Sequence, residues 1–210
     1  MTKSQKSALD RLWPQFGINP ETPIDPTVLF NRNAPLHLEI GFGMGHALLE
    51  MAQAHPENNY LGIEVHRPGV GRLLDEIEKN EITNIRLLKH DAIEVLGHQL
   101  AENNLDSVML FFPDPWHKKR HHKRRIVQPE FVTMVLSRLK PGGLFHLATD
   151  WEDYAERMME VLSQESGLNN LSGAGNFASR PESRPITKFE KRGLRLGHGV
   201  WDLLFEKDRE

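Results

Sequence analysis

The sequence predicts an α/β fold: a doubly wound, mostly parallel sheet with helices on both faces. Short apolar segments alternate along the chain with longer segments whose apolar residues recur at helical spacing, which is the pattern of such a sheet. Strands are expected at residues 36–40, 60–65, 84–89, 106–112, 144–148 and 200–205. Helices are expected around residues 48–52, 72–79, 92–99, 128–139 and 151–162. The last strand has no obvious crossover helix before it, so we expect it to be antiparallel.

The region before the first strand is expected to differ from the rest. Residues 1–35 should form a short N-terminal helix around residues 7–12 and then an irregular connector rich in proline. Residues 36–210 follow without repeats or composition shifts, and 210 residues suit one well-packed domain. In the helix at 151–162, the apolar stripe that begins with Trp151 is interpreted as core packing.

Composition excludes several classes of protein. Apolar residues make up 39% and charged residues 26% of the chain, as in ordinary globular proteins. There is no cysteine, so disulfides, thiolate metal sites and a cysteine nucleophile are excluded. The N-terminus lacks the apolar core of a signal peptide, and no run is long enough to cross a membrane. We therefore expect a cytoplasmic protein with no membrane partner.

The net charge of −3 hides a strong segregation of charge. Residues 117–125, called the basic segment below, carry six Lys and Arg and no acid. Residues 179–198 carry six more against two acids, so the remainder of the chain is strongly acidic. Two basic surfaces on an acidic body favour binding of a polyanion over a merely solvated charge run.

A rigid carboxylate directly precedes the basic segment. Asp114 stands between Pro113 and Pro115, and each proline fixes its own φ and restricts the residue before it. This arrangement indicates chemistry placed beside a surface that holds a polyanion.

The turn after the first strand contains Gly41, Gly43 and Gly45. A strand, a glycine-rich turn and a helix could bind a dinucleotide or another adenosine cofactor. The dinucleotide pattern requires its third glycine at position 46, which is His46 here, and Glu39 would repel a pyrophosphate. S-adenosylmethionine has no phosphate and carries an ammonium and a sulfonium, so a carboxylate at this place favours it.

Three further acids follow strand ends: Glu64, Asp91 and Asp114. Ligands of open α/β sheets bind outside the carboxyl ends of the strands, so all four acids could converge there. Glu64 suits ribose hydroxyls, Asp91 suits an adenine amino group, and Asp114 would then face the reacting methyl group. Each acid alone could equally be a helix cap or an exposed turn.

Several motifs resemble known families. The segments Glu39-Ile40-Gly41-Phe42-Gly43-Met44-Gly45, Gly62-Ile63-Glu64-Val65-His66 and Pro141-Gly142-Gly143 resemble those of class I S-adenosylmethionine-dependent methyltransferases. More narrowly, the chain is similar to the bacterial tRNA (guanine-N7)-methyltransferase family in Phe111-Phe112-Pro113-Asp114-Pro115-Trp116-His117-Lys118, His122-Lys123-Arg124-Arg125, Ala148-Thr149-Asp150-Trp151 and Arg184-Pro185-Ile186-Thr187-Lys188-Phe189-Glu190. The resemblance runs from about residue 2 to the end.

The resemblance implies a seven-stranded Rossmann-like methyltransferase fold, S-adenosylmethionine as cofactor, and methylation of guanine 46 in the tRNA variable loop. It implies cofactor contacts at Glu39, Glu64, Asp91 and Asp114, with Asp114 as the active-site residue. It implies substrate contacts at Lys118, Asp150, Thr187, Lys188, Phe189 and Glu190, and RNA contacts at Arg120, His121, His122, Lys123, Arg124 and Arg125. In this family a longer basic arm often precedes the region of Thr2, and this chain starts where that arm would end, so RNA affinity from such an arm is not among the expectations for this chain.

The chemistry of guanine N7 suggests a role for these residues. N7 has an in-plane lone pair and no proton, so methyl transfer needs alignment more than a strong base. The product ring is cationic, and we expect Asp114 to stabilise the developing charge. Asp150 and Glu190 are candidate acceptors for the guanine edge, while Phe189 is a stacking face or simply a buried residue.

Other interpretations remain. His117, His121 and His122 have metal-binding spacing, but six neighbouring cations oppose a dication, so no metal is expected. A small-molecule methyltransferase and a non-catalytic tRNA-binding subunit are the alternatives. A nicotinamide oxidoreductase is disfavoured by Glu39 and His46. The sequence leaves open whether the protein is a monomer or a homodimer.

Overall fold

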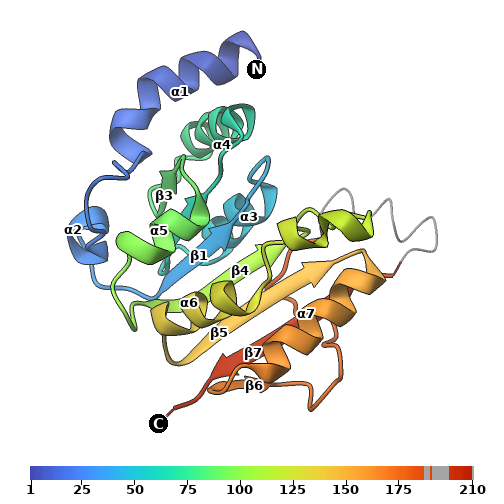
Figure 1. The fold of residues 1–210 in the computed structure, drawn as a ribbon. Helices are drawn as coiled ribbons and strands as arrows, with labels where there is room; N and C mark the ends of the chain where they lie inside the picture. Colours follow the sequence, from blue (N-terminus) through green and yellow to red (C-terminus); the bar gives the residue numbers. More distant parts are fainter. Residues whose placement is uncertain (187–189, 191–198, 210) are drawn as a thin grey trace.

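A computed structural model describes residues 1–186, 190 and 199–209 of the chain (Figure 1). The helices before the middle strand are α1 (Lys3–Phe16), α2 (Pro26–Phe30), α3 (His46–Ala54), α4 (Arg67–Lys79) and α5 (Ala92–His98). The 3-10 helix η1 (Lys119–Arg124) and the helices α6 (Pro129–Arg138) and α7 (Glu152–Gln164) follow. The strands are β1 (Leu36–Ile40), β2 (Asn59–Ile63), β3 (Ile85–Leu88), β4 (Leu105–Phe111), β5 (Leu139–Thr149), β6 (Leu168–Asn170) and β7 (Trp201–Lys207).

The strands form one seven-stranded sheet in the order β3-β2-β1-β4-β5-β7-β6. The first five strands are parallel to one another, and β7 pairs antiparallel with both β5 and β6. The doubly wound, mostly parallel sheet with an antiparallel last strand is therefore confirmed. The chain reverses its strand order between β1 and β4, which places the carboxyl ends of β1 and β4 side by side at a topological switch point.

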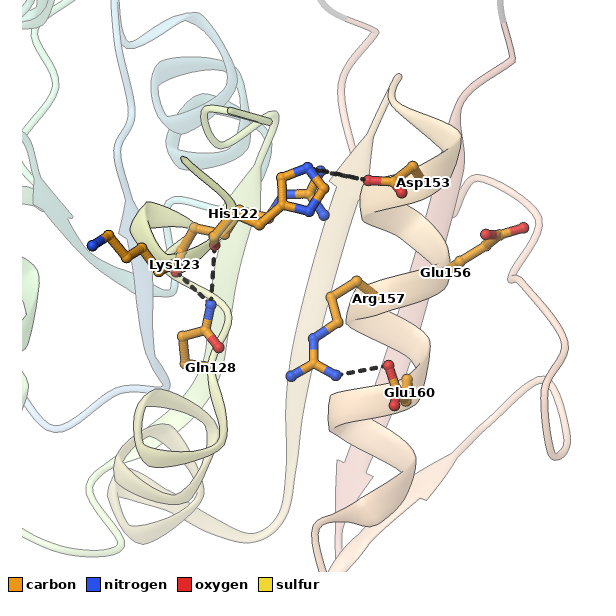
Figure 2. A pocket seen from close by; sticks show the side chains of 8 residues that line it. His122, Lys123, Gln128, Asp153, Glu156, Arg157 and Glu160 are labelled. Carbon is orange, nitrogen blue, oxygen red and sulfur yellow. Dashed lines mark hydrogen bonds and ion pairs between the residues drawn. The ribbon is translucent and has the colours of Figure 1, made fainter. Parts of the chain in front are cut away.

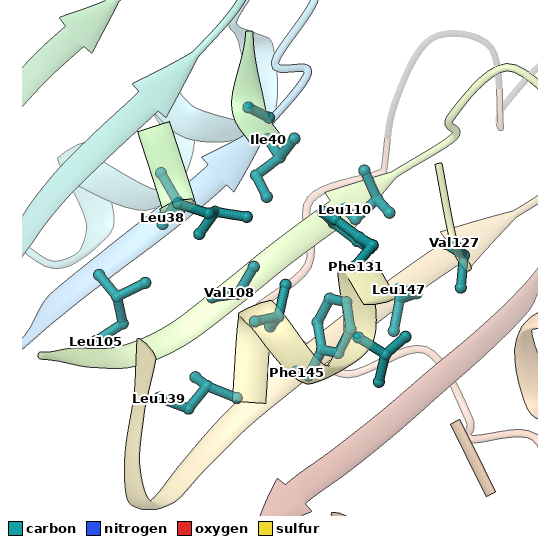
Figure 3. Close-up of a cluster of buried hydrophobic side chains, with 14 of the residues drawn as sticks. Leu38, Ile40, Leu105, Val108, Leu110, Val127, Phe131, Leu139, Phe145 and Leu147 are labelled. Atoms are coloured by element: carbon teal, nitrogen blue, oxygen red, sulfur yellow. The ribbon is translucent and has the colours of Figure 1, made fainter. Parts of the chain in front are cut away.

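Alternation along the strands divides the apolar core between the two faces of the sheet. Leu38, Val108 and Phe145 point to the face covered by α5, α6 and α7, where they pack with Phe131 of α6 (Figure 3). Their strand neighbours point to the opposite face, where Met109 packs in a second cluster with side chains from α1, α3 and α4. Successive side chains of a strand point to opposite faces, so both faces must be covered.

The N-terminal region is more ordered than expected. The helix predicted around residues 7–12 extends over α1, and the connector predicted to be irregular contains α2. A capping box begins α1, in which Thr2 Oγ1 accepts from Gln5 N at 3.2 Å and Thr2 N donates to Gln5 Oε1 at 2.8 Å. Pro14 lies inside the last turn, and α1 nevertheless continues to Phe16, because its apolar face packs along α4.

Two other boundaries differ from expectation. Strand β5 begins at Leu139, five residues before the predicted start, with an irregular pairing to β4 near Ser107. Strand β6 was missed because three residues carry too little periodicity to be recognised. Trp151 is not part of the core stripe of α7: it is the N-cap residue and is 38% exposed, whereas Tyr154 and Met158 are fully buried as predicted.

No helix in the described part of the chain is long and apolar enough to cross a membrane.

Candidate active site at the carboxyl edge of the sheet

The predicted acids follow four neighbouring parallel strands. Glu39 is the penultimate residue of β1, and Glu64 directly follows β2. Asp91 comes three residues after β3, and Asp114 comes three residues after β4. The strands lie in the order β3-β2-β1-β4, so the fold brings these acids to one edge of the sheet.

The glycine loop (residues 41–45) adopts a backbone that side chains with a Cβ rarely adopt. Gly41, Gly43 and Gly45 have φ values of 71°, 56° and 75°, all in the left-handed region that favours glycine. A Cβ on Gly69 of α4 would overlap the carbonyl oxygen of Gly43. The first turn of α4 therefore lies directly against the loop.

Two side chains fix the glycine loop from outside. Glu64 Oε2 accepts from Gly43 N at 2.7 Å, and Glu64 Oε1 accepts from Val65 N and His66 N at 2.8 and 2.9 Å. Arg72 of α4 donates to the Met44 carbonyl at 2.7 Å. The expectation for Glu64 concerned ligand contacts only. The structure shows that it also holds the loop, and that Arg72 does so as well, which no local sequence pattern indicates.

Glu39 is a buried acid with an unsatisfied oxygen. Its side chain is 3% exposed, and no donor among the described residues lies within hydrogen-bond distance of Oε2. Burial, and then the charge of Glu64, raises the pKa of Glu39 to about 8. A buried oxygen without a partner is costly. A cationic group bound beside the glycine loop would satisfy it.

Asp91 is exposed and caps α5. Its Oδ1 accepts from Ile93 N at 2.8 Å and from Glu94 N at 3.4 Å. Asp91 is therefore a helix cap, which is one of the alternative roles expected for each acid. The same carboxylate could accept a further hydrogen bond from a ligand at this sheet edge.

The loop that carries Asp114 (residues 112–116, the Asp114 loop) is strained at both ends. Phe112 has a φ of 53° and Trp116 a φ of 47°, a conformation that bulky residues rarely adopt. Asp114 itself is exposed. Two left-handed residues and two prolines thus set the direction in which one exposed carboxylate is presented.

Arg125 anchors the far side of this loop. It donates from Nε to the Pro115 carbonyl at 2.8 Å and from Nη2 to Asp153 at 2.5 Å, and its guanidinium lies 4.7 Å from the centre of the Tyr154 ring. The bond from Arg125 lowers the pKa of Asp153. Arg125 is 3% exposed. The expected RNA contact of Arg125 therefore has to be corrected, because its cation is turned inward to hold the loop.

The turn after β5 lies against the Asp114 loop. The rings of His117 and Trp151 are 4.2 Å apart, so the start of the basic segment packs on the turn that contains Asp150. Asp150 and Lys118 are both exposed. His117 directly follows the Asp114 loop, so the turn that contains Asp150 lies close to that loop.

The rest of the basic segment forms η1 and points largely to solvent. Lys118, Lys119, Arg120, Lys123 and Arg124 are exposed, while His121 and His122 are half-buried. The Arg124 guanidinium lies 5.0 Å from the centre of the Trp116 ring, which connects η1 to the Asp114 loop.

A groove lies between η1 and α7, as Figure 2 shows. Its α7 wall carries Asp153, Glu156 and Glu160, and Arg157 on that wall is paired with Glu160 at 2.7 Å. These acids disfavour a phosphate inside the groove. His122 and Lys123 line the groove on the η1 side, and Lys123 is exposed.

The predicted substrate contacts at Thr187, Lys188 and Phe189 lie outside the described residues. Glu190 is described and buried, and both of its oxygens accept from Arg184, at 2.6 and 2.8 Å. Of the two acceptors expected for the guanine edge, only Asp150 is exposed. No group of three or more His, Asp or Glu side chains in the described part of the chain could hold a metal ion.

Comparisons with known proteins agree with this geometry. Residues 33–203 match the family model described as "Putative methyltransferase". Two curated proteins named tRNA (guanine-N(7)-)-methyltransferase are similar to this chain: the protein of Hydrogenovibrio crunogenus is 56% identical and that of Pseudomonas putida is 59% identical. Each alignment spans 99% of this chain and 87% of the relative's own length.

Solved structures show the same fold at low identity. The 16S rRNA methyltransferase KamB superposes with a TM-score of 0.63 at 13% identity, over 86% of this chain and 91% of that one. A SAM-dependent methyltransferase from Aquifex aeolicus superposes with a TM-score of 0.57 at 14% identity, over 97% and 96% of the two chains.

Proposed function

The chain belongs to the tRNA (guanine-N(7)-)-methyltransferase family, and from this premise we propose that it transfers the methyl group of S-adenosylmethionine to N7 of a guanine in tRNA. The observation that carries the proposal is that curated relatives with this name match 99% of the chain. The match therefore includes the glycine loop, the Asp114 loop and the basic segment. By the resemblance of these motifs, the target is guanine 46 of the variable loop.

The residues at the carboxyl edge fit S-adenosylmethionine. The unsatisfied Oε2 of Glu39 supplies an acceptor for a cationic group, and the glycine loop lets a ligand approach the backbone closely. Glu64 would accept from ribose hydroxyls while it holds Gly43, and Asp91 would accept from an adenine amino group. When bound, the cofactor supplies a methyl group on a sulfonium. The chain's own residues have to hold that methyl group in line with N7 of the guanine.

Asp114 is proposed to stabilise the charge that forms on guanine. N7 attacks with a lone pair and loses no proton, so the reaction requires alignment and not a base. As the new N–C bond forms, the methyl–sulfur bond would break with its electron pair left on sulfur, so the positive charge would pass to the base. A fixed carboxylate nearby lowers the energy of that transition state. The strained, proline-flanked loop supports this role, because it presents Asp114 in one direction without further reorganisation.

The guanine and its strand are assigned to the surface beside Asp114. Asp150 is the exposed acceptor for the N1–H and amino group of the base, and Lys118 lies on the same surface. Thr187, Lys188 and Phe189 remain proposed substrate contacts. Glu190 is proposed to act at this site together with Arg184, to which it is bound. Arg120, His121, His122, Lys123 and Arg124 are proposed to neutralise tRNA phosphates.

Incubation of the purified protein with S-adenosylmethionine and unmodified tRNA, followed by nucleoside mass spectrometry, tests the proposal. We expect 7-methylguanosine from tRNA, none from a transcript with adenine at position 46, and no methylation of small metabolites. Methylated metabolites without methylated tRNA would indicate a small-molecule methyltransferase. Tight tRNA binding without 7-methylguanosine would indicate a non-catalytic subunit. Either result would refute the proposal.

A further inference from the structure

Arg184 is the largest fully buried side chain of the protein's described part, and it binds Glu190, a residue of the proposed site. It lies on the face of the sheet opposite α6 and α7, near Phe111 of β4 and Asp202 of β7. Asp202 projects from that face because its strand neighbours Leu203 and Phe205 pack on the side of α6 and α7. Its own backbone is fixed by a turn, in which Arg184 N donates to the Pro181 carbonyl at 3.0 Å and Arg180 donates to the Arg184 carbonyl at 2.6 Å.

The guanidinium of Arg184 binds two carboxylates at once. It donates to Asp202 of β7 from Nε and Nη2 at 2.7 and 2.9 Å, and to Glu190 from Nη1 and Nη2 at 2.6 and 2.8 Å. Four bonds in two forks require the planar set of five N–H donors that only arginine has. A lysine in this position could not bind both carboxylates in this way.

A histidine completes the cluster. His146 of β5 lies with Nε2 at 2.8 Å from Asp202 Oδ1, and both residues are buried. Burial alone would raise the pKa of Asp202, but the bonds from His146 and Arg184 outweigh it and hold that pKa below its usual value. The cluster therefore keeps an ionised acid inside the protein, and removal of Arg184 would leave Glu190 and Asp202 without the cation they share.

The same guanidinium faces the Asp114 loop. It lies 6.0 Å from the centre of the Phe111 ring and 5.7 Å from that of Phe112. Phe112 is the left-handed residue two positions before Asp114, and its N–H donates to the Ala148 carbonyl at 2.7 Å. Arg184 thus contacts both Phe112, the residue that directs the Asp114 loop, and Glu190.

We propose that Arg184 is a positioning residue that couples Glu190 to the Asp114 loop, so that both are in place when the guanine reacts. The proposal rests on the function proposed above. The Arg184 side chain contacts Glu190 and the Asp114 loop, which both belong to the proposed site, and it does so without contact to substrate. Arg125 holds the other end of the same loop through the Pro115 carbonyl.

The test compares Arg184→Lys and Asp202→Asn with wild type. Arg184→Lys keeps the positive charge but loses the double fork. Asp202→Asn leaves the arginine and its bonds to Glu190 in place, so it serves if the lysine variant does not fold. Arg138→Lys is the matched control: Arg138 has a side chain that is 14% exposed and donates to the Leu96 carbonyl at 2.7 Å, far from the carboxyl edge.

Two measurements separate positioning from simple loss of stability. The first is the single-turnover rate of methyl transfer at saturating tRNA and cofactor, with tRNA affinity measured in parallel. The second is hydrogen exchange at the Phe112 amide, which reports the Asp114 loop without any reaction. Displacement of a reacting group by about 1 Å can cost about 100-fold in rate. We expect Arg184→Lys to lose about 30-fold or more, with tRNA affinity within about twofold of wild type and faster exchange at Phe112.

Unchanged exchange at Phe112 in both variants would overturn the proposal. So would a rate loss no larger than that of Arg138→Lys at an equal fall in melting temperature. If wild type makes no 7-methylguanosine, the proposed function fails, and the Phe112 exchange still decides whether Arg184 holds the loop.

Discussion

Replacement of Glu39 with Gln should remove a pH-dependent loss of stability. The folded protein raises the pKa of Glu39 from 4.5 to about 8, because the carboxyl is buried and lies near Glu64. A raised pKa in the folded state means that stability is fully present below pH 4.5 and is lost as the pH rises toward 8. Over this window the unfolded chain gives up the proton and the folded chain keeps it.

The magnitude follows from the size of that change. Each pH unit between the two pKa values costs the folded state about 1.4 kcal/mol, so the loss between pH 5 and pH 8 is on the order of 3 to 4 kcal/mol for wild type. Glu39→Gln should show none of this component. Glu50→Gln, an exposed change on α3, should keep the wild-type pH profile.

The same residue predicts proton release when the cofactor binds. At pH 7 a group with a pKa of about 8 is about nine-tenths protonated. A bound cation next to Glu39 favours its ionised form. Binding of S-adenosylmethionine should therefore release close to one proton at pH 7 and become tighter as the pH rises toward 8.

Urea denaturation from pH 5 to pH 8 measures the first effect, and titration calorimetry in two buffers of different ionisation enthalpy measures the second. Parallel stability profiles of wild type and Glu39→Gln would refute the burial argument. Cofactor binding without proton release, or with equal release in Glu39→Gln, would refute the proposed contact.

Three further predictions test the other parts of the site. Asp114→Asn should lower the single-turnover rate about 100-fold with tRNA bound normally, as loss of one preorganised electrostatic group does in other enzymes; nearly full activity would show that its charge is not used. Arg124→Ala should weaken tRNA binding and reduce the slope of log affinity against log salt concentration by about 0.7 to 0.9. Filter binding from low to high salt measures this slope, and an unaltered slope would count against a phosphate contact. Gly69→Ala should weaken cofactor binding about tenfold or more, since the clash with Gly43 displaces the glycine loop by an amount that matters for binding. Gly97→Ala, whose Cβ meets nothing within 4 Å, is its control, and equal affinities in calorimetry would contradict the packing argument.

The sheet and the row of acids could be predicted because they depend on local patterns. Apolar strands end in turns that carry Glu64, Asp91 and Asp114, and parallel strands bring their carboxyl ends to one edge whatever the loops do. The three glycines follow from the same logic, since a turn of that shape requires residues that accept a positive φ.

The internal partners of charged residues could not be predicted. Arg125 ends a run of cations and has the same residue type as its neighbours. The structure nevertheless turns it inward to the Pro115 carbonyl and to Asp153, and no sequence pattern connects Arg125 with either partner. Arg184 and Asp202 are 18 residues apart, and only the fold brings Arg184 onto the face of β7 that carries Asp202. Sequence periodicity reports which face a residue occupies, and it does not report which buried charge lies opposite.

The most direct test of the central claim is methyl transfer to a tRNA in which guanosine 46 is replaced by 7-deazaguanosine. This change puts a C–H group in place of N7 and leaves the Watson–Crick edge of the base unaltered. If the protein methylates N7 of that guanine, the guanosine transcript should accept one methyl group and the 7-deazaguanosine transcript none, with both bound equally well. Equal methylation of the two transcripts would contradict the account.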